Sequence, residues 1–114
     1  MKPPASELCE GLPGAKRILQ GLSDFHAGRH SIPACLVRMA RPRLIRAQIM
    51  DASMPGDDGA ELELYQLIAS AEGPRAFSRY NALVRELVSF EHALDHRLAR
   101  LRTPYLCEVK VIPS

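Results

Sequence analysis

Residues 74–102, PRAFSRYNALVRELVSFEHALDHRLARLR, carry the strongest helical pattern of the chain. Apolar residues recur there at alternating steps of three and four, from Phe77 through Leu87 to Leu101, and Glu91 interrupts the series. This spacing places them on one face of an α-helix, as in a heptad seam. A helix of this length spans about 43 Å, whereas a compact domain of this size has a radius of gyration of only ~13 Å. We therefore predict one long helix, 74–102, that bends or packs at its distal end on something outside its own chain.

Shorter helices are predicted before it. Apolar residues follow helical spacing through residues 15–27, and Gly28 is well placed to end that segment. Ser31 and Pro33 together form a helix-start signal, because the hydroxyl can cap the first turn and proline fits within it. This next helix should stop before Pro42, which disfavours the helical conformation in the preceding residue.

Two further segments differ in how clearly they can be assigned. Asp58 and Glu61 form a plausible capping box for a helix that Gly73 ends. Residues 43–50 fit either a short helix or a strand with alternating faces. Residues 105–112 are rich in β-prone side chains and partly alternate, so they favour a short strand.

The predicted fold class is all-α, with four or five helices, the long helix 74–102 and a short C-terminal strand. The alternative is an α+β fold in which strands 43–50 and 105–112 pair. The chain of 114 residues has the size of a single domain, 1–114. Its first residues, 1–12, are rich in proline and glycine and are expected to form a loosely held arm.

Composition suggests a cytoplasmic protein without membrane contact. No apolar run approaches the ~20 residues that a membrane span needs, and the first residues lack the apolar stretch of a secretory signal. The cysteines are odd in number, with no CxxC spacing, which favours reduced thiols over a disulfide framework: Cys9, Cys35 and Cys107.

The charges are segregated along the chain. Residues 25–50 contain arginines and no acid, whereas residues 51–74 contain acids and no lysine or arginine. These segments could face each other or solvent. Alternatively, the basic one could bind nucleic acid or an acidic protein, and the candidate anion-binding residues are then Arg38, Arg41, Arg43 and Arg46.

The histidines occur as two pairs with a spacing of four residues, His26 with His30 and His92 with His96. On a helix, residues four apart share a face, so two imidazoles can reach one metal ion. Stable zinc binding requires three or four ligands, and Gly28 is expected to separate the first pair by ending its helix. We expect no bound metal and no cofactor, and a metal-binding protein using His92 and His96 is kept as an alternative.

Arg85 and His92 are separated by six residues within the predicted long helix. This arrangement resembles the motif of the HEPN family, all-helical domains of about this size in which an arginine is followed by a histidine after four to six residues. The resemblance implies a dimeric ribonuclease in which Arg85 steadies a phosphate and His92 moves protons. The polar residue that usually follows the family's arginine is replaced by Glu86.

No phosphate-binding loop or nucleophile elbow occurs in the sequence, so we assign no catalytic residue and favour a non-enzyme. We predict a small accessory or regulatory protein that self-associates as a homodimer through its long helix and binds a protein or nucleic-acid partner. The residues predicted for the dimer contact are Leu94, Leu98 and Leu101.

Overall fold

The computed structural model describes residues 5–51 and 59–102, and every regular element within these ranges is a helix. The all-α class is therefore confirmed. Six α-helices and one 3-10 turn follow each other along the chain: α1 (Ala5–Cys9), α2 (Ala15–His26), α3 (Ile32–Met39), α4 (Arg41–Arg46), α5 (Ala60–Glu72), η1 (Gly73–Arg75) and α6 (Ala76–Arg102).

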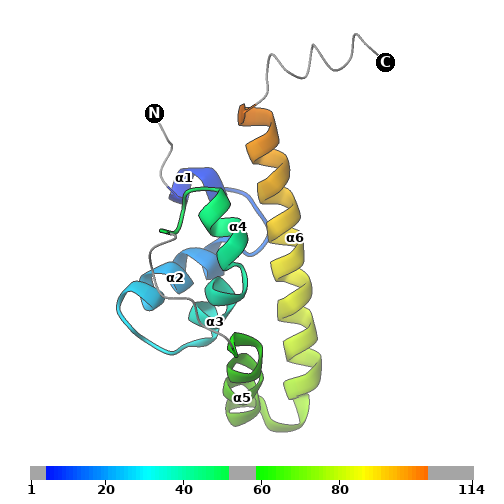
Figure 1. Cartoon of the computed structure of the whole chain (residues 1–114). Coiled ribbons are helices and arrows are strands. Elements are labelled where there is room, and N and C mark those ends of the chain that lie inside the picture. The colour runs from blue at the N-terminus through cyan, green and yellow to red at the C-terminus, as the bar shows by residue number, and fades with distance from the viewer. Residues whose placement is uncertain (1–4, 52–58, 103–114) are drawn as a thin grey trace.

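The long helix α6 runs along the whole bundle, and the shorter helices lie against one side of it (Figure 1). It contains 27 residues, two fewer than predicted, because Gly73–Arg75 forms a 3-10 turn between α5 and α6. Gly73 has a φ of 57° and ends α5, as expected for the residue that reverses the chain there. Helices α5 and α6 consequently form an antiparallel hairpin.

The core lies between α6 and the shorter helices. From α6 it takes a stripe of fully or nearly buried side chains one turn apart: Leu83, Leu87, Phe90 and Leu94. The other helices contribute their own apolar faces to the same cluster, including Ile18, Leu36, Val37, Leu44, Leu64 and Ile68. Of the predicted seam, Leu87 and Leu94 are therefore buried, whereas its end residues Phe77 and Leu101 are exposed, at 66% and 58%.

Helices α2 and α3 pack closely, and Gly21 makes this possible. A Cβ atom at Gly21 would lie 2.2 Å from the carbonyl oxygen of Pro33 and 2.6 Å from Cγ2 of Val37. The Ser31 side chain caps α3 as predicted, because its Oγ accepts a hydrogen bond from the Ala34 amide at 3.2 Å.

Residues 41–46 are helical, so the α+β alternative with a strand over 43–50 is wrong. Pro42 lies in the first turn of α4, where its missing amide hydrogen costs nothing, and Leu44 is buried in the core. The partner segment of that alternative and the predicted C-terminal strand, both over 105–112, lie outside the described residues.

The expectation of a loosely held arm over 1–12 is also wrong for the part of it that the structure describes. Residues 5–9 form α1, and both Leu8 and Cys9 are buried. The Arg97 side chain of α6 donates hydrogen bonds to the carbonyl oxygens of Leu8 at 2.9 Å and Glu10 at 2.6 Å. A distant arginine thus satisfies carbonyl groups at the end of this short helix, which local sequence patterns do not reveal.

We predict that Gly21→Ala lowers the free energy of unfolding by about 1–3 kcal/mol, because the added methyl group forces α2 and α3 apart. Urea denaturation followed by circular dichroism measures the change. Ser23→Ala, an exposed position on the same helix, is the matched control and should change the stability by less than ~0.5 kcal/mol. Equal stabilities of the Gly21→Ala variant and the unmodified protein would contradict the close approach.

Candidate interaction surfaces

The three leucines predicted for a dimer contact lie in different environments. Leu94 is 0% exposed and belongs to the core of its own chain, so its assignment to an intermolecular contact is wrong. Leu98 is partly buried against that same core. Leu101 alone of the three is well exposed, at 58%. A heptad pattern identifies a buried face, but it does not say whether the same chain or another one covers it.

A different apolar surface lies along the α5–α6 hairpin. Besides Leu101 near the end of α6, four large apolar side chains are exposed on these two helices, and we call them the hairpin patch: Leu62, Tyr65, Phe77 and Val88. The rings of Tyr65 and Tyr80 pack edge to face, with centroids 5.8 Å apart, across the two helices.

This ring contact fixes the direction in which the hairpin patch faces. Leu62 precedes Tyr65 by one turn of α5, whereas Phe77 precedes Tyr80 by one turn of α6 and Val88 follows it by two. Because α5 and α6 are antiparallel, these spacings direct the side chains of both helices toward the same side of the hairpin. Helical spacing thus places Leu62, Phe77 and Val88 toward that side.

The four arginines predicted to bind an anion do not act as one group. The Arg38 guanidinium bonds Oε1 of Glu63 at 2.7 Å, and its side chain is only 7% exposed. Arg43 bonds Oδ2 of Asp95 on α6 at 2.7 Å. Arg41 is half-buried and Arg46 is exposed. The Arg38 guanidinium is therefore buried in an ion pair with Glu63, and Arg43 is paired with Asp95 of α6.

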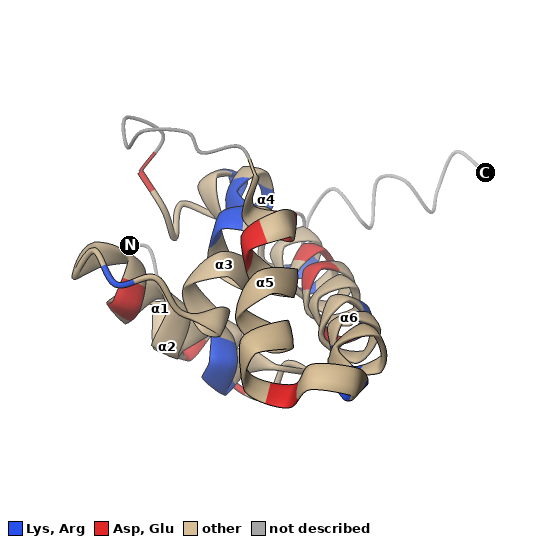
Figure 2. Cartoon of the chain, turned by 90° about the horizontal axis from the view of Figure 1, so that it is seen from below, with Lys and Arg blue, Asp and Glu red and all other residues tan. Residues whose placement is uncertain are grey.

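Glu63 links the basic and acidic segments of the chain. Its carboxylate contacts Arg38 of α3 and lies 3.0 Å from Nδ1 of His30. Figure 2 shows the acidic first turn of α5 beside the basic end of α3. The hydrogen bond from Arg38 lowers the pKa of Glu63, outweighing the opposite effect of burial. The segregated charges thus do face each other at this contact.

A second polar cluster surrounds Asp24, which is buried near the end of α2. Its carboxylate accepts hydrogen bonds from Ser31 Oγ at 2.7 Å, Gln20 Nε2 at 3.0 Å and Arg29 Nε at 3.0 Å. The Ser31 bond is the main cause that lowers the pKa of Asp24. The cluster ties the α2–α3 loop to both helices, and sequence analysis missed it because the partners are scattered across irregular structure.

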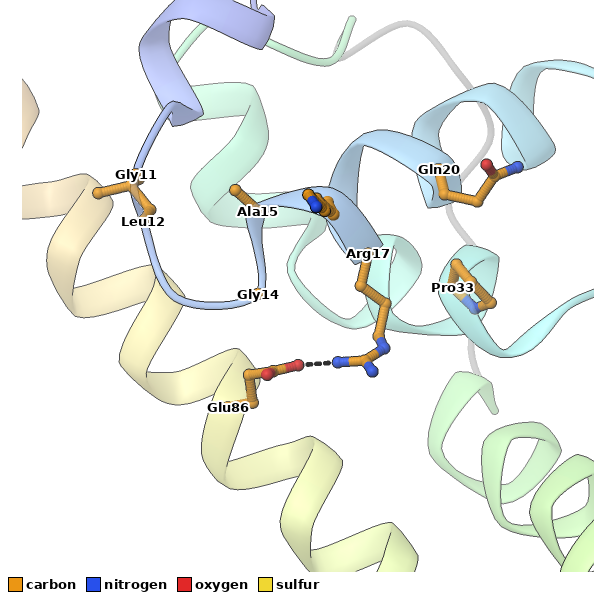
Figure 3. A pocket seen from close by; sticks show the side chains of 9 residues that line it. Gly11, Leu12, Gly14, Ala15, Arg17, Gln20, Pro33 and Glu86 are labelled. Carbon is orange, nitrogen blue, oxygen red and sulfur yellow. Dashed lines mark hydrogen bonds and ion pairs between the residues drawn. The ribbon is translucent and has the colours of Figure 1, made fainter.

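The acidic side chains of α6 are directed away from its outer face. Glu86 pairs with Arg17 beside the first turns of α2 (Figure 3), and Asp95 pairs with Arg43. Glu91 is half-buried, and this burial raises its pKa. The exposed outer face carries hydrogen-bond donors and cations at steps of three and four, which we call the outer strip: Arg85, Ser89, His92, His96 and Arg100.

The two histidine pairs do not converge on a metal site. His26 ends α2 and His30 lies beyond it near Glu63, so the first pair does not share a helix. His92 and His96 are exposed on α6. Among residues 5–51 and 59–102, no group of three or more histidine, cysteine, aspartate or glutamate side chains is arranged to hold a metal ion.

Arg85 and His92, the pair that resembles the HEPN motif, share the exposed face of α6. They are two helical turns apart, which separates their backbone positions by about 10.5 Å along the axis. The following residue, Glu86, turns to the other side and pairs with Arg17. It is therefore directed away from a site formed by Arg85 and His92.

Neither described cysteine has the character of a nucleophile. Burial raises the pKa of both Cys9 and Cys35 to about 11, and the carboxylate of Glu63 adds to the effect at Cys35. At neutral pH both therefore remain thiols, which react slowly. The third cysteine, Cys107, lies outside the described residues.

A hollow of about 660 Å³ opens beside the first turn of α2 (Figure 3). The chain enters α2 there through Gly14, which has a φ of 72°, and Lys16 and Gln20 line the hollow. Its acidic wall is Glu86, which the neighbouring Arg17 neutralises. The hollow is open, and no group of acid, base and nucleophile lines it.

Comparison with known proteins gives no relative: no protein-family model, no curated protein and no solved structure matches the chain. None of the helices in the described part of the chain is long and apolar enough to cross a membrane. The exposed surfaces of the described residues are therefore the basis for proposing a function.

We predict that Leu94→Ala lowers the free energy of unfolding by about 2–5 kcal/mol, because it leaves a cavity in the core. Leu101→Ala, at an exposed position near the C-terminal end of α6, should cost less than ~0.5 kcal/mol in dilute protein. Chemical denaturation of both variants at submicromolar concentration measures the difference. A Leu94→Ala loss that appeared only at concentrations where the chain associates would instead assign Leu94 to an interface.

Glu63→Gln should lower the free energy of unfolding at pH 7 by about 1–3 kcal/mol, because it weakens a charged hydrogen bond to the buried Arg38. Glu63 has a lowered pKa in the folded state. Its stabilising contribution is therefore complete above the pKa of an unfolded glutamate, ~4.3, and is lost as the pH falls through the lower folded value.

Urea denaturation between pH 7 and pH 3 tests this. The difference in stability between the unmodified protein and Glu63→Gln should shrink as the pH falls. Glu61→Gln, an exposed position in the same first turn of α5, is the control and should show a much smaller difference at every pH. A difference for Glu63→Gln that is independent of pH would contradict the ion pair.

Proposed function

We propose that this protein is a small non-catalytic accessory or regulatory protein that self-associates through α6 and its hairpin partner α5, and that also binds a partner molecule. The hairpin patch is the observation that carries the proposal. Leu62 is 63% exposed, Phe77 66% and Val88 41%. Contiguous exposed apolar side chains of this kind are typical of interaction sites, whereas single exposed ones are ordinary.

A second copy of the chain is the occupant that the hairpin supports best. Two antiparallel helices with an apolar edge can pack against the same edge of another copy and form a four-helix arrangement. A two-fold interface buries the same residues on both chains, so one surface serves both partners. The Tyr65–Tyr80 ring contact fixes the position of the edge within each chain.

The absence of a convergent acid–base or metal group among the described residues leaves interaction as the best-supported role. The arrangement of Arg85 and His92 is compatible with the ribonuclease alternative, and Ser89 and His96 are exposed on the same face of α6. We therefore propose a binding function in preference to catalysis.

Light scattering coupled to size-exclusion chromatography tests self-association. At micromolar concentration the unmodified protein should have the mass of a dimer, and Val88→Asp should shift it toward the monomer, because burying an unpaired carboxylate is costly. Ser89→Asp adds the same charge at the next residue, on the outer face, and should leave the dimer intact. A monomeric mass for the unmodified protein, or equal effects of the two variants, would contradict the proposal.

A further inference from the structure

The outer strip of α6 is an exposed surface that carries cations and hydrogen-bond donors but no carboxylate of its own. It presents two guanidinium groups, two imidazoles and a hydroxyl along about 22 Å of helix, from Arg85 to Arg100 at ~1.5 Å per residue. The acids of α6 are Glu86, Glu91 and Asp95, and none of them lies on the strip. Two of the three are already paired with arginines of other helices. The strip therefore carries the two cations Arg85 and Arg100 without a carboxylate among its own residues, and Glu7 of α1 lines the same hollow as Arg100.

We propose that the outer strip binds the phosphate backbone of a single-stranded nucleic acid. This proposal rests on the role of an interaction protein, but it does not require the dimer. Arg85 and Arg100 would neutralise phosphates at the two ends of the strip. Between them, the Ser89 hydroxyl and the ring nitrogens of His92 and His96 can donate hydrogen bonds to phosphate oxygens.

The composition of the strip favours a nucleic-acid backbone over an acidic protein helix. Protein interfaces derive most of their affinity from large apolar or aromatic side chains buried at their centre. The strip itself contains no Leu, Ile, Met, Phe, Tyr or Trp side chain, and the exposed apolar residues beside it are Ala82, Ala99 and Val88. A phosphate backbone needs only cations and donors, because counterion release supplies much of its affinity. The same lack of apolar anchors argues against insertion into a membrane surface.

The strip is also separate from the part of the hairpin patch around Phe77. Phe77 lies eight residues before Arg85, whereas Val88 is a direct neighbour of Arg85 and His92 on the helix surface, at spacings of three and four. A substitution at Phe77 can therefore disturb the hairpin patch without touching the strip. This separation allows nucleic-acid binding and self-association to be tested independently on one set of variants.

Fluorescence anisotropy with a labelled 20-nucleotide single-stranded RNA of mixed sequence tests the proposal on the full chain. The double variant Arg85→Gln/Arg100→Gln should bind about tenfold more weakly at 50 mM salt. It should also reduce the slope of log affinity against log salt by about 1.4, since each phosphate contact contributes ~0.7 for single strands. The control, Arg75→Gln/Arg79→Gln, removes the same charge away from the strip and should retain the original slope.

Three results would overturn the proposal: no binding of the RNA at 50 mM salt, an equal loss in both double variants, or binding of poly-glutamate as tight as that of the RNA. The same samples are examined by light scattering. Phe77→Asp, which changes the hairpin patch at a distance from the strip, should be monomeric and still bind through Arg85 and Arg100. If the protein does not self-associate but still binds RNA, only the proposed dimer is refuted. If it self-associates but does not bind RNA, only the proposed role of the strip is refuted.

Discussion

The rest of the structure depends on the length of α6. A helix of 27 residues extends about 40 Å, and the remaining helices of a chain of 114 residues cannot surround it. They instead cover one side, where Leu83, Leu87, Phe90 and Leu94 form the stripe that holds the bundle together. One face of α6 must therefore meet solvent or another molecule, and both proposed surfaces follow from this limit.

Ion pairs to other helices determine which charges remain on that exposed face of α6. Arg17 and Arg43 approach α6 from two flanks and engage Glu86 and Asp95. Each pair is half-exposed and contributes little to stability by itself. Their larger effect is on the charge distribution, because they neutralise the negative side chains of α6 and leave its outer strip with cations. The net charge of +2 gives no indication of this sorting.

Much of the local structure could be predicted from the sequence because short-range signals determine it. The Ser31 cap and the Gly73 reversal depend on neighbouring residues, and the structure confirms both. Contacts between residues far apart in the sequence could not be predicted in this way. The helix α1 is held by Arg97, far away in the sequence, so residues 1–12 resembled a loose arm. The segment 43–50 was ambiguous because eight residues are too few to distinguish the helical period of 3.6 from the strand period of 2. The burial of Leu44 in the core accompanies the helix that forms there.

At the candidate sites, too, the sequence pattern predicted the helix face of a residue but not what surrounds that residue in the fold. Periodicity correctly placed Leu94 on the apolar face of α6 but could not identify which chain covers it, and the answer is its own core. Arg38 was grouped with other arginines by sequence, yet Glu63 holds it inside the bundle. Conversely, Arg85 and Arg100 are fifteen residues apart and share a surface only because the helix is continuous between them.

Self-association through the hairpin patch would change how the outer strip works. A dimer presents two strips, and a nucleic acid long enough to contact both gains a second binding event that is effectively intramolecular. Each strip has few fixed charges, so its own affinity is modest and strongly weakened by salt. Pairing two weak strips would make binding depend on the length of the nucleic acid and on the concentration of the protein. The shorter helices leave one side of α6 uncovered. That exposed side would then supply both the dimer contact and the selectivity for long nucleic acids.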